Sequence, residues 1–312
     1  MSVAVIGSIN TDVTTYGVAL PRLGETVMGK NYAIELGGKG ANQAAAAARL
    51  GAEVEFVGRV GADAFGELAL ARLCEFGVSI RHLTKDAEAA TGIAIIGVDA
   101  QGQNAITIIP GANMRLGEKE LTDALPALDK TKVLMLQLEI PIPTCLAAAR
   151  AARERGVIVV LDPAPAPLGP LPEELYPLID VITPNETEAE VLLGFRPRTL
   201  DEASRAAREF IERGAHSAIV TLGSRGAFLA RSKIRGDLPE GPLAPFAVEP
   251  VSTVAAGDCF NAGLAVALAE GRDLMEAARF ACACGALCVT RPGSAASAPQ
   301  RKEVEELLAR AA

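Results

Sequence analysis

An apolar run of strand length, Val133-Leu134-Met135-Leu136-Gln137-Leu138, is followed by the helix-length stretch Thr144 to Arg155 and a second apolar run, Val157 to Leu161. Short apolar runs of this kind are typical of strands that are buried on both faces. A strand, a helix and a further strand in succession form the unit that joins two parallel strands of one sheet. This stretch therefore predicts the α/β fold class.

The same alternation recurs on both sides of this unit. Its members are Val3 to Ile6, Gly40 to Leu50, Val54 to Val57, Gly66 to Phe76, Val181 to Thr183, Leu200 to Arg213 and Ala218 to Leu222. Repeated strand and helix units build sheets whose faces are both covered by helices. We therefore expect a doubly wound, mostly parallel sheet flanked by helices.

Two segments break this rhythm, one at about residues 11–35 and one at about 91–110. In the second segment, two apolar runs flank a polar turn, Asp99 to Gly102, which is the pattern of a β-hairpin. We expect the two segments to pair into a small β sheet that acts as a lid and excludes water from a site. The lid would belong to a single catalytic domain of residues 1–312. A simple extension of the main sheet is the alternative.

Composition and charge restrict the possible functions. The chain has 312 residues, of which 50% are hydrophobic, and a net charge of -8, so it is an ordinary globular protein without a basic surface for nucleic acid. It contains no signal-like start and no run of about 18 apolar residues that could span a membrane. We therefore expect a cytoplasmic protein that binds neither nucleic acid nor membranes. The two histidines, His82 and His216, lie in no zinc-hydrolase or serine-hydrolase motif.

A glycine-rich segment, Gly37-Gly38-Lys39-Gly40-Ala41-Asn42-Gln43, precedes an alanine-rich helix. Glycines let the backbone approach a ligand closely, and the free amides at a helix start suit an anionic group. The segment is not a P-loop, because Ala33 stands at the first glycine position and Gly40 follows the lysine. On these residues alone, ligand binding and tight packing of helix against sheet are both open.

Polar residues follow two of the predicted strands, at the strand ends where parallel sheets bind ligands. Asn10 and Asp12 come after the first strand, and in extended backbone they would share a face and grip adjacent hydroxyls. A turn or a cap is the alternative, which the local sequence favours. Glu139 closes the run that begins at Val133. Because a buried carboxylate needs a partner, Glu139 indicates contact with a ligand.

Two later segments carry similar ambiguity. Asn185 and Glu188 lie three residues apart at the start of a helix, a spacing that also matches a capping box. The segment Thr221 to Gly226 has two glycines, at 223 and 226, which could admit a phosphate or simply form a turn. Capping and the turn are the leading interpretations until other segments are considered.

The segment Ala255-Ala256-Gly257-Asp258 precedes a further helix. Small residues at a helix start leave amide hydrogens free to form an anion hole, with Asp258 beside them in the first turn. A helix cap would explain the aspartate but not the three small residues before it.

Taken together and in order, six segments along nearly the whole chain resemble the PfkB, or ribokinase-like, carbohydrate kinase family. They are Gly7 to Asp12, Gly37 to Ala44, Gln137 to Glu139, Thr183 to Glu188, Thr221 to Gly226 and Ala255 to Asp258. The resemblance implies a doubly wound α/β domain whose β lid is shared across a homodimer. It also implies transfer of the γ-phosphate of ATP to the 5-hydroxyl of D-ribose, with Mg²⁺.

Other functions are weighed against this one. A related kinase would act on deoxyribose, on a nucleoside such as adenosine or pseudouridine, or on fructose. A catalytically silent sugar-binding regulator would have no need of Asp258. A dinucleotide-dependent oxidoreductase would carry G-x-G-x-x-G after the first strand, which this chain lacks.

The resemblance also implies roles for individual residues. Asp258 would be the catalytic base, beside an anion hole made by the backbone of Ala255, Ala256, Gly257 and Asp258 itself. The sugar-binding residues would be Asn10, Asp12, Gly38, Lys39, Asn42, Glu139 and Asp258. The ATP site would be lined by Asn185, Thr221, Gly223, Gly226 and Gly257. Glu188 would organise Mg²⁺ through water.

A site for an activating monovalent cation, usually K⁺, is implied as well. The family typically has an aspartate where this chain has Ser252, so the site lacks a full charge, which is worth roughly a few kcal/mol at close range. Donors that remain are Val254, Cys288, Arg291, Gly293 and Ser297, and Glu249 is a candidate replacement carboxylate. The sequence therefore leaves K⁺ activation open.

Overall fold

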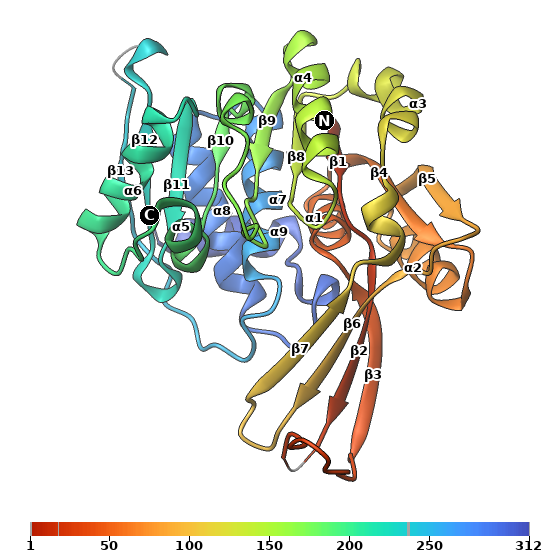
Figure 1. Ribbon diagram of the computed structural model, residues 1–312. Coiled ribbons are helices and arrows are strands. Elements are labelled where there is room, and N and C mark those ends of the chain that lie inside the picture. The colour runs from red at the N-terminus through yellow and green to blue at the C-terminus, as the bar shows by residue number, and fades with distance from the viewer. Residues whose placement is uncertain (1, 18, 236–237, 312) are drawn as a thin grey trace.

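The structure is a computed structural model that describes residues 2–17, 19–235 and 238–311. Within these residues the larger of two sheets has nine strands (Figure 1). In spatial order they are β13 (Gly241–Leu243), β12 (Ala227–Arg231), β11 (Ser217–Thr221), β10 (Val181–Ile182), β9 (Ile158–Leu161), β8 (Val133–Leu136), β1 (Ser2–Ile6), β4 (Glu53–Gly61) and β5 (Ser79–Asp86). All neighbours are parallel except that β12 runs antiparallel to β11 and β13, which confirms the mostly parallel sheet.

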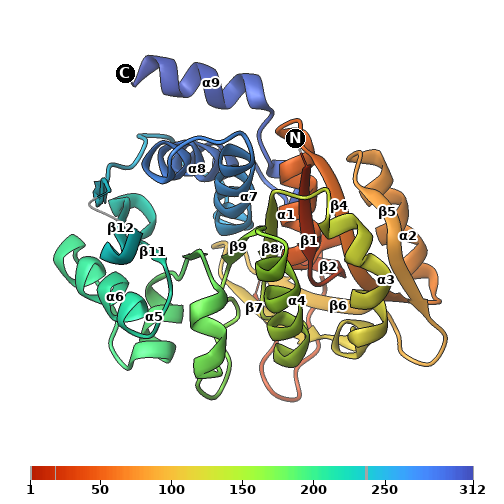
Figure 2. The same ribbon diagram turned by 90° about the horizontal axis from the view of Figure 1, so that it is seen from above.

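Helices cover both faces of this sheet, as Figure 2 shows. One face is packed by α1 (Lys39–Arg49), α2 (Ala64–Glu75), α7 (Ala256–Ala269), α8 (Leu274–Cys288) and α9 (Arg301–Arg310). The other is packed by α3 (Glu118–Leu128), α4 (Ile142–Glu154), α5 (Glu186–Leu193) and α6 (Leu200–Glu212). Alternate residues of one strand serve the two cores: Val3 and Val5 face the first, Ala4 and Ile6 the second, as the period of a strand requires.

Short 3-10 helices complete the connections. They are η1 (Gly111–Arg115), η2 (Glu173–Leu178), η3 (Gly223–Arg225), η4 (Lys233–Arg235) and η5 (Ala295–Ser297). In the part of the chain that is described, no helix has the length and apolar character needed to cross a membrane.

The chain changes direction across the sheet at β1. From β1 it passes outward to β4 and β5, and later returns to the other side of β1 to form β8, β9, β10 and β11. The connections that leave β1 and β8 therefore turn to opposite faces, through α1 and α4 respectively. Such a switch point opens a crevice at the carboxyl ends of the two strands, where ligands bind in open α/β sheets.

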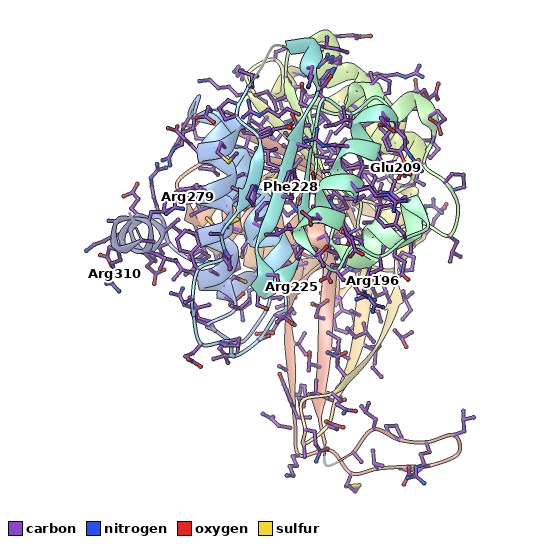
Figure 3. The ribbon with its side chains drawn as sticks, turned by 90° about the vertical axis from the view of Figure 1, so that its left-hand side faces the viewer. Arg196, Glu209, Arg225, Phe228, Arg279 and Arg310 are labelled. Carbon is purple, nitrogen blue, oxygen red and sulfur yellow. The ribbon has the colours of Figure 1, made fainter. Side chains whose placement is uncertain are left out.

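The segments that broke the sequence rhythm form a second, four-stranded sheet, called here the small sheet. Its spatial order is β3 (Asn31–Gly37), β2 (Asn10–Tyr16), β6 (Gly92–Val98) and β7 (Asn104–Ile109). The central pair β2 and β6 is parallel, and each outer strand pairs antiparallel with its neighbour. The small sheet is thus separate from the main sheet instead of an extension of it, and it projects away from the main body (Figures 1 and 3).

Two differences from the sequence expectations have clear causes. The run expected to be a strand through Leu138 ends as β8 at Leu136, and the amide of Leu138 donates to the carbonyl of Ala164 in the loop after β9. Strand β5 was not predicted, because its side chains do not alternate between buried and exposed and periodicity gives no signal there.

Candidate active site

Asp258 lies where two helices meet at the crevice. It stands in the first turn of α7 and is buried. Its two carboxylate oxygens accept hydrogen bonds from consecutive residues of α1: Oδ2 from Asn42 Nδ2 at 3.0 Å and Oδ1 from Gln43 Nε2 at 3.2 Å. The predicted base and the predicted sugar ligand Asn42 are therefore in direct contact, and α1 lies beside α7 (Figure 2).

The glycines at the start of α1 allow the chain to pack very closely. Gly38 has φ 85°, and a Cβ there would lie 2.8 Å from the amide nitrogen of Asn10. A Cβ on Gly40 would lie 2.6 Å from the amide nitrogen of Ser8. Any side chain would push the loop after β1 away from the start of α1. Close packing, one of the two interpretations left open by the sequence, is thus realised, and it brings Lys39 and Asn42 to the crevice.

Glu139 has the partners that a buried carboxylate needs. Its Oε2 accepts a hydrogen bond from Ser8 Oγ at 2.5 Å and from the Lys39 amide at 3.0 Å. Ser8 Oγ in turn accepts from the Gly40 amide at 3.2 Å. Glu139 therefore ties the ends of β1 and β8 to the start of α1. Sequence reasoning missed Ser8, because a lone serine after a strand carries no distinctive signal.

Lys39 is a cation among carboxylates. Burial acts to lower the pKa of Lys39, but Asp162, Asp258, Glu139 and Glu188 together raise it above its usual range. The crevice therefore keeps one fixed positive charge, suited to an anionic or hydroxyl-rich ligand.

Asn10 and Asp12 are strand residues, and the turn or cap that the local sequence favoured is wrong. Both belong to β2, where they stand opposite Gly37 and Glu35 of β3 and so share one face of the small sheet. Asn10 Oδ1 accepts from Asn113 Nδ2 at 2.7 Å. That bond fixes the orientation of the Asn10 amide and leaves its nitrogen free to donate.

Asn113 was missed by sequence reasoning. It lies in η1, where its Oδ1 accepts from the Ile9 amide at 2.8 Å and its Nδ2 also donates to the Ile9 carbonyl at 3.1 Å. The two residues are more than a hundred positions apart in the chain, so no local sequence pattern predicts their contact.

Asp12 differs from an ordinary surface aspartate. Burial raises the pKa of its carboxyl to about 7, and the charges of Glu139, Glu35 and Asp258 act in the same direction. A carboxyl group with a pKa near neutrality changes its charge within the working range of an enzyme, as groups at functional sites often do.

The start of α7 has an unusual backbone. Ala255 is its N-cap with φ 58°, the one positive φ outside glycine among the described residues. The amide of Ala256 donates to the carbonyl of Thr253 at 3.4 Å, and the first intrahelical bond runs from Cys259 to Ala255. The amides of Gly257 and Asp258 are therefore the donors that the helix itself leaves unused. Strained backbone of this kind persists where surrounding structure enforces it and is common at active sites.

The predicted nucleotide residues lie at neighbouring strand ends. Asn185 forms an isolated parallel bridge with Thr221, the last residue of β11. Gly223 and Gly226 lie in the turn from β11 to β12, and a Cβ on Gly226 would lie 2.2 Å from the carbonyl oxygen of Leu243. The turn interpretation is correct for these glycines. Arg225 lies at the same end of the molecule, toward the small sheet (Figure 3).

Asn185 and Glu188 form the capping box of α5. Asn185 Oδ1 accepts from the amides of Thr187 and Glu188, while Glu188 Oε2 accepts from the Asn185 amide at 2.8 Å and Oε1 from Asn185 Nδ2 at 2.7 Å. Burial raises the pKa of Glu188, against the effect of these bonds and of Lys39. Because carboxylate oxygens are the ligands that Mg²⁺ prefers and often contacts through water, Glu188 fits the metal role implied for it.

The predicted monovalent cation site has a different character. Ser252 Oγ accepts from the Val254 amide at 3.3 Å, Cys288 Sγ donates to the Val254 carbonyl at 3.5 Å, and Ser297 Oγ donates to the Ser294 carbonyl at 2.6 Å. The Arg291 guanidinium pairs with Glu303. These groups bond to one another, and none of them is a carboxylate, so the set does not fit a K⁺ site with a charged ligand.

A carboxylate that the sequence did not suggest lies nearby. Oε1 of Glu35, on β3, is 3.5 Å from the position that a Cβ on Gly293 would occupy. Glu249, the candidate replacement, is exposed in the irregular segment between β13 and α7.

Comparison with known proteins gives a consistent result. The pfkB family carbohydrate kinases match residues 1–301. The chain is 40% identical to a ribokinase of Haemophilus influenzae, covering 98% of both chains, and 35% identical to a deoxyribokinase of Salmonella typhi, covering 99% of both. The structure is similar to that of Arabidopsis thaliana ribokinase complexed with ribose and ATP, with a TM-score of 0.89, 36% identity and 98% of each chain covered. The family that the six sequence segments predicted is confirmed: this chain belongs to the pfkB family of carbohydrate kinases.

Proposed function

We propose that this protein transfers the γ-phosphate of ATP to the 5-hydroxyl of D-ribose and releases ribose 5-phosphate and ADP. The observation that carries the proposal is the buried carboxylate of Asp258, held by Asn42 and Gln43 beside the unused amides at the start of α7. Full-length similarity to ribokinases supports ribose as the acceptor.

Phosphoryl transfer through a loose transition state needs mainly positioning and charge stabilisation. Asp258 accepts the proton of the 5-hydroxyl as the new oxygen–phosphorus bond forms. Because the hydroxyl loses its proton late, a carboxylate is a sufficient base. The amides of Gly257 and Asp258 donate to the charge that develops on the phosphoryl group.

The sugar hydroxyls would bind where the small sheet meets the crevice. The proposed ligands are Asn10, Asp12, Gly38, Lys39, Asn42, Glu139 and Asp258. Asn113 supports this assignment. Its hydrogen bond to Asn10 Oδ1 fixes the orientation of the Asn10 amide, so that Asn10 Nδ2 can donate to a sugar hydroxyl.

ATP would lie along the adjacent strand ends, against Asn185, Thr221, Gly223, Gly226 and Gly257. Glu188 would hold Mg²⁺ through its water ligands. When bound, the metal would supply positive charge that neutralises the phosphate groups. Lys39, whose positive charge is maintained by its carboxylate neighbours, contributes from the protein side.

The small sheet would act as the lid of a single catalytic domain that spans residues 1–312, and as the contact of a homodimer. The face opposite Asp12, called here the outer face, carries four large exposed apolar side chains among the described residues: Tyr32, Ile34, Ile95 and Ile109. A contiguous patch of exposed apolar side chains is typical of a protein–protein interface. A second copy of this chain is the partner that we propose.

The remaining partners follow from the reaction and the charge. The net charge of -8 supports small-molecule substrates and no nucleic acid or membrane partner. Because ATP is the phosphoryl donor, we place the activity in the cytoplasm.

A coupled assay of ADP release over a panel of acceptors tests the proposal. We expect kcat/KM for D-ribose to exceed that for 2-deoxyribose, adenosine, pseudouridine and fructose by roughly tenfold or more, because a site built to bond a hydroxyl rejects an acceptor without it. Deoxyribose is the serious competitor, given the 35% identity to a deoxyribokinase. A nucleoside as the best acceptor would refute the proposal.

A further inference from the structure

We propose that Gln43 and Asp162 are positioning residues for the base: Asp162 holds the Gln43 amide, and that amide fixes the carboxylate of Asp258. The inference rests on the proposed function, because it assumes that Asp258 is the base. Neither residue would touch the reacting atoms.

One buried amide nitrogen joins two carboxylates. Gln43 Nε2 lies 2.9 Å from Asp162 Oδ2 and 3.2 Å from Asp258 Oδ1. A glutamine amide has two hydrogens to donate, so each carboxylate receives one. All three side chains are buried, and the two bonds connect α1 with the loop after β9 and with α7.

A third residue sets the direction of the amide. Gln137 Nε2 donates to Gln43 Oε1 at 2.6 Å. The oxygen of Gln43 is thereby engaged, and its nitrogen must face the two aspartates. The sequence leaves room for this arrangement, because a Cβ on Gly7 would lie 2.0 Å from Gln137 Oε1.

Asp258 is held at both oxygens. Asn42 Nδ2 donates to Oδ2, and Gln43 Nε2 donates to Oδ1. Two donors from consecutive residues of one helix fix the plane of the carboxylate, so that a remaining lone pair can point to the substrate. A base must be held in this way, since a displacement of about 1 Å can cost roughly 10²-fold in rate.

Asp162 gives the Gln43 amide a second hydrogen-bond acceptor, whose position does not depend on Asp258. It closes β9 and precedes Pro163, so its backbone is held by the sheet. Burial raises the pKa of Asp162 well above its usual range, while Lys39 opposes the shift and Glu188, Asp258 and Glu139 add to it. A carboxyl group kept inside the protein under these conditions makes sense where its acceptor oxygen is needed.

The alternative is that these bonds merely pack α1 against α7. Under that alternative, their loss would lower stability, with no particular effect on the chemical step. The two ideas therefore differ in which kinetic constant changes and in how the effect depends on Asp258.

We would measure kcat and the ribose KM for Gln43→Met, Asp162→Leu and Asp162→Asn. Gln43→Met and Asp162→Leu should each lower kcat by on the order of 10²-fold, with KM for ribose changed by less than about threefold. Asp162→Asn keeps an acceptor oxygen for Gln43 and should retain most of the activity. A neutral residue that rescues the site would exclude a mere need for charge at position 162.

A double-mutant cycle tests the connection to the base. In an Asp258→Asn background, Gln43→Met should cause no further loss of kcat. Additive losses, or an unchanged kcat in Gln43→Met or Asp162→Leu, would overturn the inference. If Asp258→Asn itself leaves turnover intact, the proposed function fails instead, and the two failures are distinct.

Thr131→Val is the matched control, because Thr131 is buried and precedes the amino end of β8, the end of the strand opposite to the crevice. It removes the hydrogen bond from Thr131 Oγ1 to the Ala127 carbonyl at 2.9 Å. It should lower the melting temperature and leave kcat unchanged. Should Gln43→Met fail to fold, the comparison of Asp162→Leu with Asp162→Asn still decides between the two ideas.

Discussion

The crevice and the small sheet both depart from the usual distribution, in which polar side chains are exposed and apolar side chains are buried. In the crevice, polar and charged groups are inside: Gln43 is 1% exposed and Asp258 is 5% exposed. On the small sheet, apolar groups are outside: Ile106 is 53% exposed and Ile95 is 41% exposed. Buried polar groups and exposed apolar patches are the departures from the hydrophobic rule that carry information about function.

The difference follows from what each region has for partners. The crevice is closed by helices on both faces of the main sheet, and its polar groups bond to one another through Ser8, Asn42, Gln43 and Glu139. The small sheet meets α2 at its base, through Thr11 Oγ1 and the Phe65 carbonyl, while apolar side chains farther along it are exposed. We infer that one chain supplies the hydrogen-bond partners of these crevice groups, whereas the exposed apolar side chains of the small sheet are covered by a second copy of the chain.

Removing the base should have the largest effect on the crevice. Asp258→Asn keeps the size of the side chain and removes its ability to accept the hydroxyl proton. We expect turnover to fall by roughly 10²–10⁴-fold, the usual contribution of a general base. Ribose binding, measured by calorimetry, should be retained. Unchanged turnover would eliminate Asp258 as the base.

Breaking the small sheet as an interface should come next. Ile95→Lys puts a charge in the middle of the outer face, and we expect the homodimer to dissociate, as measured by analytical ultracentrifugation. Leu200→Lys makes the same kind of change, apolar to charged, at an exposed site on α6. It should leave the oligomeric state unchanged. The stability of the chain should change by less than about 0.5 kcal/mol in either variant. A wild-type protein that is monomeric at all concentrations contradicts the proposed dimer.

The junction of the two regions can be examined through Asp12. Its pKa is about 7 in the folded protein and about 3.9 in an unfolded chain. Between those values the folded state binds the proton more tightly, so the stability that the protonated group provides is complete below about pH 4 and is lost as the pH rises through 7.

Asp12→Asn removes this dependence. The variant should melt at a higher temperature than the wild type at pH 8, and the difference should shrink toward pH 4. Asp123→Asn, on the exposed surface of α3, is the control and should show no such trend. An equal stabilisation at both pH values would contradict the assignment of the raised pKa to Asp12.

The smallest expected effect is that of K⁺. Because Ser252, Cys288 and Ser297 bond within the protein, we expect rates with K⁺ and with Na⁺ to differ by less than about twofold, since no ligand of the set brings a negative charge. A sharp rise in rate with K⁺ would show that a site with Ser252 in place of the aspartate still binds the activating cation. Glu35, beside Gly293, would then be the carboxylate to replace by glutamine.

Part of the candidate site could be located from the sequence because its residues follow apolar runs or precede a helix. Glu139 and Asp258 were singled out in this way, whereas the local sequence favoured a turn or a cap for Asn10, whose sugar-binding role was implied only by the family resemblance. Asp162 has the same position as Glu139, directly after an apolar run of strand length, but none of the six segments that carry the family resemblance includes it. Asn113 and Ser8 had no local signal, because their roles depend on contacts made across the fold.

The sequence by itself determined the α/β class, the separate hairpin segments and the family, since strand and helix periods and short motifs are local properties of the chain. Only the tertiary structure decided which strand follows which in the sheet, that Asn10 and Asp12 lie in a strand, and which groups surround the base. The bond between Gln43 and Asp258 joins residues 215 positions apart. Contacts at such a distance arise when the sheet brings strand ends together, and no pattern within a short window contains them.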